Sequence, residues 1–271
     1  MSGISHLSGK SHLWALIADP VSHVRAPEFV NPMFARRGLN GFLVPLQVRP
    51  ADLALTLPRL AAIGNIRGII VTIPHKEAVA RLCHELGENA KLIGAVNTVR
   101  VTDDGRLIGE MFDGVGVLAT ARSQDMNPRD RAVLMVGAGG AGRAIGFAMA
   151  AAGARKIGIA NRTASRAERL VADINAAFPT RPATLARADA SGYELVINCT
   201  SLGLRPGDAM PLPPATLQAH IDVIDIIAVR ETELMAAAGA RGCRVIGGRP
   251  MIELQFDAQL MFIGQPPALD G

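Results

Sequence analysis

Aromatic and cysteine residues are scarce in this sequence. Phe, Trp and Tyr make up 4% of the 271 residues, so any core must be built from Ala, Val, Leu and Ile, as is usual for sheets sandwiched between helices. The three cysteines, Cys83, Cys199 and Cys243, are an odd number without metal-ligand spacing. This favours a reducing, cytoplasmic compartment over a disulfide framework. The histidines show no ligand spacing either, so we expect no metal site.

Runs of apolar residues and blocks of charge are also absent. No stretch is long and apolar enough to span a membrane, and residues 13–18 are too short for a signal peptide. The net charge is +4, but the basic residues are scattered singly, which does not predict nucleic-acid binding. We therefore expect a small anionic molecule as partner, with no nucleic acid and no membrane, and a monomer or a homodimer.

A glycine-rich stretch stands out against this background. Residues 133–146, VLMVGAGGAGRAIG, predict a strand, a tight turn and a helix. In a G-x-G-x-x-G reading, Gly137 permits the turn, Gly139 admits a pyrophosphate, and Gly142 lets the helix pack on the strand. A turn required only for packing is the alternative. The cofactor contacts expected from this turn are Gly137, Ala138, Gly139, Gly140 and Ala141.

The next predicted strand, residues 156–161, bears on the choice of cofactor. NAD sites usually carry an acidic residue at its end, but here Asn161 is followed by Arg162 and Thr163, with Arg166 one turn on. Guanidinium groups supply donors for a 2′-phosphate, so NADP is favoured and NAD is possible. The alternative is that both arginines are ordinary solvated residues at a helix start.

Strands and helices alternate elsewhere, which predicts an α/β fold of two domains with a cleft between them. The first hundred or so residues already form a predicted α/β unit before the dinucleotide motif begins. Within the first domain, apolar spacing predicts a helix from about residue 76 to Leu86. Residues 91–101 and 106–112 are expected to be paired strands.

Lys76 and Asp113 are the candidate acid–base pair outside the dinucleotide motif. Lys76 opens a predicted helix, an unfavourable position for a cation on dipole grounds, and Asp113 lies at a strand-to-helix turn. A lysine that exchanges a proton with a ketone or an alcohol needs a pKa tuned by burial and a nearby carboxylate. Solvated side chains at element ends are the alternative explanation.

Several motifs in one order resemble the shikimate dehydrogenase family: VTIPHKEAV, IGAVNTV, FDGVG, VGAGGAGRAI and NRTASR. The resemblance covers nearly the whole chain. It implies a substrate-binding domain over 1–110 plus 248–271 and a Rossmann-like domain with a parallel sheet over 111–247. It implies that Lys76 and Asp113 are the catalytic pair and that the substrate hydroxyls are held by Thr72, Asn97 and Gln255. It also implies that Thr200, Ser201, Leu202 and Gly248 belong to the cofactor site, with residues 200–203 on the nicotinamide side.

Departures from the family pattern concern the substrate. The family loop NPxxHSLSP has two serines that bind the substrate carboxylate, and these fall on Val24 and Ala26. Phe112 replaces a polar residue, and a tyrosine falls on Ile227. We therefore expect NADP-dependent hydride transfer to or from a shikimate-like cyclic hydroxy acid other than shikimate. Arg25, between the lost serines, either anchors an anionic group or faces solvent.

Two other functions remain open at this point. One is a quinate-type dehydrogenase that tolerates NAD. The other is a catalytically silent, cofactor-binding regulator, which the joint retention of Lys76, Asp113 and the hydroxyl-binding residues argues against, because an unpaired buried charge is costly.

Overall fold

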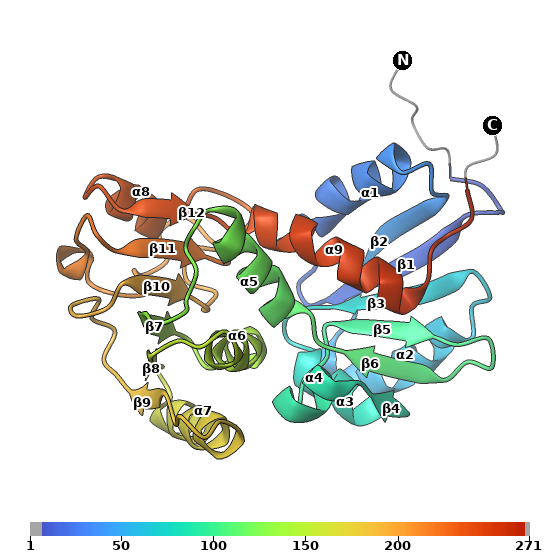
Figure 1. The fold of residues 1–271 in the computed structure, drawn as a ribbon. Coiled ribbons are helices and arrows are strands. Elements are labelled where there is room, and N and C mark those ends of the chain that lie inside the picture. Colours follow the sequence, from blue (N-terminus) through green and yellow to red (C-terminus); the bar gives the residue numbers. More distant parts are fainter. Residues whose placement is uncertain (1–6, 269–271) are drawn as a thin grey trace. The chain divides into compact units, whose positions relative to one another are not determined.

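Two compact units make up the chain in a computed structural model that describes residues 7–268. Unit 1 comprises the residues up to Phe112 together with those from Gln255 onward, and unit 2 comprises Asp113–Leu254. Each unit has its own six-stranded sheet, as Figure 1 shows. The sequence places the domain limits at 110/111 and 247/248, whereas the chain leaves unit 1 after residue 112 and re-enters it within the terminal helix.

The sheet of unit 1 is mixed and has the order β2-β1-β3-β5-β6-β4. β1 is parallel to β2 and β3, whereas β5 is antiparallel to β3 and β6. The carboxyl ends of β1, β3 and β6 therefore meet the amino end of β5 at one edge of the sheet. The strands are β1 (His12–Ala18), β2 (Gly41–Gln47), β3 (Ile66–Val71), β4 (Glu85–Leu86), β5 (Thr98–Val101) and β6 (Leu107–Glu110).

Two helices cover one face of this sheet through an aromatic cluster. The ring of Trp14 in β1 lies 5.0 Å from that of Phe34 in α1 and 5.8 Å from that of Phe256 in α9, measured between centroids. All three side chains are buried, so this aromatic cluster is part of the core of unit 1. The helices that contribute to unit 1 are α1 (Ala26–Arg36), α2 (Leu53–Ala61), α3 (Lys76–Leu82), α4 (Glu88–Ile93) and α9 (Arg249–Ile263), with the 3-10 turn η1 (Pro50–Asp52).

The segment after Lys76 differs from the sequence prediction. α3 ends at Leu82, because Cys83 adopts an extended backbone with φ −71° and ψ 143°. Leu86 lies in the short strand β4, where it pairs with Gly109 of β6. The apolar spacing that predicted a longer helix indicates only that one side of this segment faces the protein. A short strand paired with β6 meets the same requirement.

Residues 91–93 are likewise helical, although a strand was expected there. They form the last turn of α4, which ends at the left-handed Gly94 with φ +72°. The buried carboxylate of Glu110 accepts the amide hydrogen of Ala90 at 2.8 Å. This contact satisfies a backbone donor of the first helical turn, and nothing in the local sequence reports it.

The sheet of unit 2 is entirely parallel, with the order β12-β11-β10-β7-β8-β9. The order reverses between β7 and β10, as in a Rossmann-type fold. The strands are β7 (Ala132–Val136), β8 (Lys156–Ala160), β9 (Ala183–Leu185), β10 (Leu195–Asn198), β11 (Asp222–Asp225) and β12 (Arg244–Ile246). The helices are α5 (Asp113–Ser123), α6 (Gly140–Ala151), α7 (Ala164–Ala177) and α8 (Glu233–Gly239), with the 3-10 turn η2 (Pro214–Thr216).

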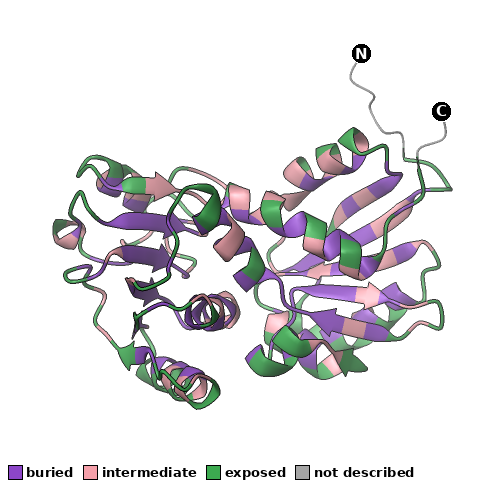
Figure 2. Ribbon diagram, in the orientation of Figure 1, coloured by how far each residue is buried: buried purple, intermediate pink, exposed green. Residues whose placement is uncertain are grey.

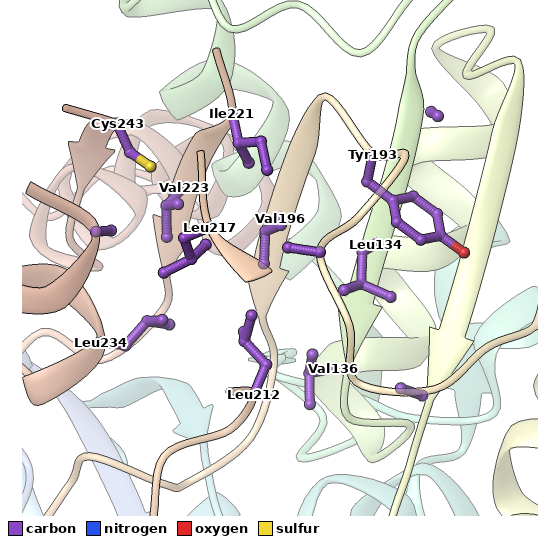
Figure 3. Close-up of a cluster of buried hydrophobic side chains, with 14 residues drawn as sticks. Leu134, Val136, Tyr193, Val196, Leu212, Leu217, Ile221, Val223, Leu234 and Cys243 are labelled. Carbon is purple, nitrogen blue, oxygen red and sulfur yellow. The ribbon is translucent and has the colours of Figure 1, made fainter. Parts of the chain in front are cut away.

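The strands of this sheet are buried along most of their length (Figure 2). Aliphatic side chains dominate one core cluster, shown in Figure 3, in which Leu134, Val196 and Val223 contact residues of the flanking loops. Tyr193 packs over Gly158, where a Cβ would lie 2.1 Å from the phenolic oxygen. Within residues 7–268, none of the helices has the length and apolar character needed to cross a membrane.

Candidate active site

Two predicted site residues of unit 1, Thr72 and Asn97, lie at the edge of the sheet where the strand ends meet. The amide of Thr72, just after β3, donates to the carbonyl of Ile17 at 3.2 Å. The carbonyl of Asn97, just before β5, accepts from Val71 at 2.8 Å, and its amide donates to the carbonyl of Glu110 at 3.1 Å. Thr72, Asn97 and the residues after β6 are therefore neighbours along one edge, the usual location of ligand sites in sheets of this class.

The side chain of Asn97 connects this edge to the terminal helix. Its Oδ1 accepts from the amide of Phe112 at 3.0 Å and from the hydroxyl of Thr98 at 2.9 Å. Its Nδ2 donates to Oε1 of Gln255 in α9 at 3.3 Å. Asn97 and Gln255 are 3% and 8% exposed, so their amide groups are held in a largely water-free environment.

Two donors at this edge have no hydrogen-bond acceptor among the described residues. As a whole residue Thr72 is half-buried, and Gln255 is 8% exposed. Neither side chain donates to another residue between 7 and 268, and neither donor atom is among the described buried polar atoms that lack a partner, so both remain accessible. A ligand hydroxyl is the kind of acceptor that both could take, which agrees with the role expected for them.

Lys76 and the backbone that precedes Asp113 both adjoin Asn97. Lys76 is the first residue of α3, and its carbonyl accepts from the amide of Val96 at 3.0 Å. Asp113, 3% exposed, is the first residue of α5 and directly follows Phe112, whose amide is bonded to Asn97. Within unit 1, backbone hydrogen bonds thus hold the first residue of α3 and the last residue before α5 close to Asn97.

The loop after β1 carries no serine at positions 24 and 26. Its first amide, that of Asp19, donates to the carbonyl of Ile73 at 3.1 Å, which places the loop beside Thr72. Arg25 stands at the N-cap of α1 and forms an ion pair with Glu28 in the first helical turn. The hydrogen bond to Glu28 raises the pKa of Arg25 above its usual value. The sequence suggested that Arg25 either anchors an anionic ligand group or faces solvent. Its ion pair with Glu28 was not predicted.

In unit 2 the three glycines of the fingerprint occupy different environments. Gly137 has φ +112°, and a Cβ there would lie 2.8 Å from the backbone of Cys199. A Cβ on Gly142 would lie 2.3 Å from the carbonyl oxygen of Gly137. Gly139, the N-cap of α6, has an ordinary φ of −83° and no atom within 4 Å of its Cβ position. Turn geometry and packing therefore require two of the glycines, and the third leaves open space at a helix N-terminus that fits a pyrophosphate.

Asn161 fastens this turn to the end of β8. Its Oδ1 accepts from the amide of Ala138 at 3.0 Å, and its Nδ2 donates to the carbonyl of Thr163 at 2.9 Å. Thr163 is the N-cap of α7, and Arg162 and Arg166 are exposed beside it without an ion pair to any described residue. The asparagine thus shapes the turn in addition to removing a carboxylate from this position.

The remaining predicted cofactor residues lie in two further loops. Thr200, Ser201 and Leu202 follow β10, and the hydroxyl of Thr200 accepts from the amide of Leu202 at 3.0 Å. Gly248 precedes α9, and a Cβ there would lie 2.1 Å from the carbonyl oxygen of Ile226. Close packing behind β11 by itself requires a glycine at 248.

A buried polar cluster beneath residues 200–203 was not predicted. Asn198 ends β10 and Asp225 ends β11, and both are fully buried. Burial raises the pKa of Asp225, while hydrogen bonds from Thr232, the Ile227 amide and Asn198 oppose this effect. In the sequence, this cluster is indicated only by a polar residue at the end of each of the two buried strands. Among the described residues, no group of three His, Cys, Asp or Glu side chains could hold a metal ion.

Comparison with known proteins identifies the family. A model of the shikimate dehydrogenase substrate binding domain matches residues 16–99, and a model of shikimate / quinate 5-dehydrogenase matches residues 118–203. The NADP(+) shikimate dehydrogenase of Rubrobacter xylanophilus is 38% identical over 271 residues, covering 97% of this chain and 95% of that protein. The chain belongs to the shikimate dehydrogenase family. This membership confirms the predicted two-domain α/β fold and the oxidoreductase class.

The solved structures that resemble this chain are named for more than one activity. A shikimate dehydrogenase crystallised with NADP+ has a TM-score of 0.88 and 30% identity, covering 97% of this chain and 94% of that one. The 5-ketofructose reductase of Gluconobacter sp. strain CHM43, in a ligand-free form, has a TM-score of 0.81 and 31% identity, covering 94% of this chain and 93% of that one. Family membership therefore leaves the substrate to be argued from the residues of the site.

Because Gly139 and Gly142 have different surroundings, replacing each with alanine should affect stability and NADP binding differently. Gly139→Ala should change the free energy of unfolding by less than about 1 kcal/mol, because no protein atom opposes the new methyl group. It should weaken NADP binding at least about tenfold, because that group enters the space for the pyrophosphate. Gly142→Ala should destabilise the protein by roughly 1–3 kcal/mol. Thermal unfolding and cofactor titration measure both effects, and wild-type NADP affinity in Gly139→Ala contradicts the assignment.

Proposed function

We propose that this chain catalyses NADP-dependent hydride transfer between the ketone and secondary-alcohol forms of a polyhydroxylated cyclic compound resembling shikimate. The observation that carries the proposal is the edge of the unit 1 sheet. There, Asn97 bonds to Phe112 and Gln255, adjoins the backbone of Lys76 through Val96, and leaves donors on Thr72 and Gln255. Family membership and this polar edge together support catalysis rather than cofactor binding alone.

Lys76 is the proposed proton donor to the ketone oxygen and, in the reverse direction, the proton acceptor from the alcohol. Asp113 is proposed to orient that lysine as the second member of the acid–base pair. Thr72 and Gln255 would donate to substrate hydroxyls, and Asn97 would keep Gln255 in place. When bound, NADP supplies or accepts the hydride, and these side chains manage the proton and the orientation of the substrate.

The residues of unit 2 support NADP as the cofactor. The open position at Gly139 would admit the pyrophosphate, and Arg162 and Arg166 are exposed at the end of β8, where the ribose 2′ position lies in proteins of this fold. The relative from Rubrobacter xylanophilus is named as NADP(+)-dependent. Use of NAD by a quinate-type enzyme is the alternative.

The substrate is proposed to differ from shikimate in its acidic group. Val24 and Ala26 have no hydroxyl with which to bind a carboxylate, and the charge of Arg25 is balanced by Glu28. Phe112 packs its ring against Phe262 of α9 at 5.6 Å between centroids and therefore serves apolar packing. The residues of this loop thus provide little recognition of an acid.

A second candidate substrate class is an uncharged polyhydroxy ketone. Two observations favour it: the internal pairing of Arg25 with Glu28, and the 31% identity to a protein named 5-ketofructose reductase. Assays of shikimate, quinate, their deoxygenated or aminated analogues and neutral keto-sugars, each with both cofactors, distinguish the two classes. A silent regulator would bind NADP and turn over none of them.

We also propose a cytoplasmic location. Cys83, Cys199 and Cys243 all remain free thiols, as expected of a protein kept in a reducing compartment.

Replacing Lys76 tests the proposed acid–base role. Lys76→Met keeps the length of the side chain and removes the proton, so kcat on the best substrate of the panel should fall about 10²- to 10⁴-fold. The matched control is Lys91→Met on α4, an exposed lysine paired with Glu88, which should leave kcat unchanged. Steady-state kinetics would disprove the role if Lys76→Met kept nearly wild-type turnover.

Restoring the two serines tests the substrate proposal. The double variant Val24→Ser, Ala26→Ser should raise kcat/KM for shikimate by at least roughly tenfold to a hundredfold, because one hydrogen bond to a charged group contributes about 1.5–3 kcal/mol. Val21→Ser in the same loop is the control and should give no gain. Strong shikimate turnover by the wild-type protein would refute the finer proposal and leave the oxidoreductase function intact.

Removing Arg162 tests the cofactor preference. Arg162→Ala should raise the Kd of NADPH at least about tenfold and leave that of NADH unchanged, since only NADPH has the 2′-phosphate. Arg155→Ala, which removes an arginine paired with Glu194 at the opposite end of β8, should change neither value. Equal losses for both cofactors in titrations of Arg162→Ala would contradict a role in reading the phosphate.

A further inference from the structure

One buried amide holds the loop after β10 at two points. This nicotinamide loop, defined here as residues 200–203, begins two residues after Asn198. Oδ1 of Asn198 accepts from the amide of Thr200 at 3.0 Å and from its hydroxyl at 2.7 Å. Nδ2 donates to the carbonyl of Leu202 at 3.1 Å and to Oδ1 of Asp225 at 3.0 Å. The full hydrogen-bonding capacity of this amide is therefore used, and three of its four bonds go to the loop.

The loop is also closed on itself and packed from below. The hydroxyl of Thr200 donates to Asn198 and accepts from the amide of Leu202 at 3.0 Å. Gly203 ends the loop with φ +98°, and a Cβ there would lie 2.9 Å from Cγ2 of Thr232. The backbone of residues 200–203 consequently has little freedom to change shape.

Asp225 supports the arrangement from the neighbouring strand. Its Oδ2 accepts from the hydroxyl of Thr232 at 2.7 Å, and its Oδ1 accepts from the amide of Ile227 at 3.1 Å and from Asn198. Thr232 in turn caps α8 by accepting from the amide of Met235 at 3.1 Å. A fully buried carboxylate is costly unless it is completely hydrogen-bonded, and here every bond serves the strand ends and the loop.

We propose that Asn198 and Asp225 are positioning residues that hold the nicotinamide loop in the shape that receives the nicotinamide end of NADP. Neither residue touches the reacting atoms. They act through Thr200 and Leu202, and they contribute to the orientation of the ring more than to the affinity of the cofactor. This inference rests on the proposed function and on the family resemblance, which implies that the loop lies on the nicotinamide side of the cofactor.

Asp222 provides a matched control on the same strand. It is buried at the opposite end of β11 and forms ion pairs with Arg131 at 2.8 Å and Arg244 at 2.7 Å. A purely structural need for buried carboxylates in β11 would apply to both aspartates. Only Asp225 is bonded to the residue that holds the loop, so the two should differ when the cofactor is examined.

The experiment uses the whole chain and two probes, 2′,5′-ADP, which lacks nicotinamide, and the fluorescence of bound NADPH. Thr200→Val removes the hydroxyl that joins Asn198 to Leu202 and keeps the shape of the side chain. It should leave the Kd of 2′,5′-ADP within about twofold and abolish at least half of the change in NADPH fluorescence. Thr200→Ser keeps the hydroxyl and should restore the wild-type signal. Asn198→Ala and Asp225→Asn should act in the same direction as Thr200→Val, where they fold.

Asp222→Asn should lower the temperature of unfolding and leave both cofactor signals unchanged. The inference is overturned if Thr200→Val keeps the wild-type fluorescence, or if it weakens 2′,5′-ADP and NADPH in equal proportion. A wild-type protein that binds NADPH without any change in fluorescence also overturns it, and this result leaves the proposed function standing. A wild-type protein that binds no NADPH contradicts the proposed function itself.

Discussion

The need to satisfy buried polar groups at strand ends shapes both functional regions of this protein. In unit 1, Asn97 bonds to the backbone after β6 and to the terminal helix. In unit 2, Asn198 bonds to the loop after β10 and to the next strand. An amide suits this position because it donates and accepts at once, so one side chain can hold several chain segments that are distant in sequence. In unit 1 this leaves the donors of Thr72 and Gln255 in defined positions, where a ligand could accept from them.

Close contacts between atoms also restrict the shape of the glycine-rich turn after β7. The glycine turn is confined by its own backbone at Gly142 and by Cys199 at Gly137, while the Gly139 position stays open. A fingerprint of three glycines therefore combines two packing requirements with one position where a ligand can enter. The asparagine at the end of β8 adds a hydrogen bond to the same turn, which links the cofactor preference to the shape of the cradle.

The loop after β1 is where this chain departs from the family motif. The loop lies beside Thr72, through the bond from Asp19 to Ile73, and it presents aliphatic side chains and an arginine bound to its own helix. The residue types at the proposed catalytic positions, Lys76 and Asp113, match the family motifs. Under the proposed function, one fold would transfer hydride on different polyhydroxylated compounds.

The sequence by itself determined the alternation of elements, the turn between β7 and α6, and the residue types of both predicted sites, because these depend on local spacing and on motif order. It did not predict where α3 ends, since a helix and a paired strand bury Leu86 equally well. Only the tertiary structure decided that Asn97 meets Gln255, 158 residues away, and that Asp225 meets Asn198. Hydrogen bonds between distant segments leave no periodic trace in a sequence, because their geometry exists only after the sheets have formed.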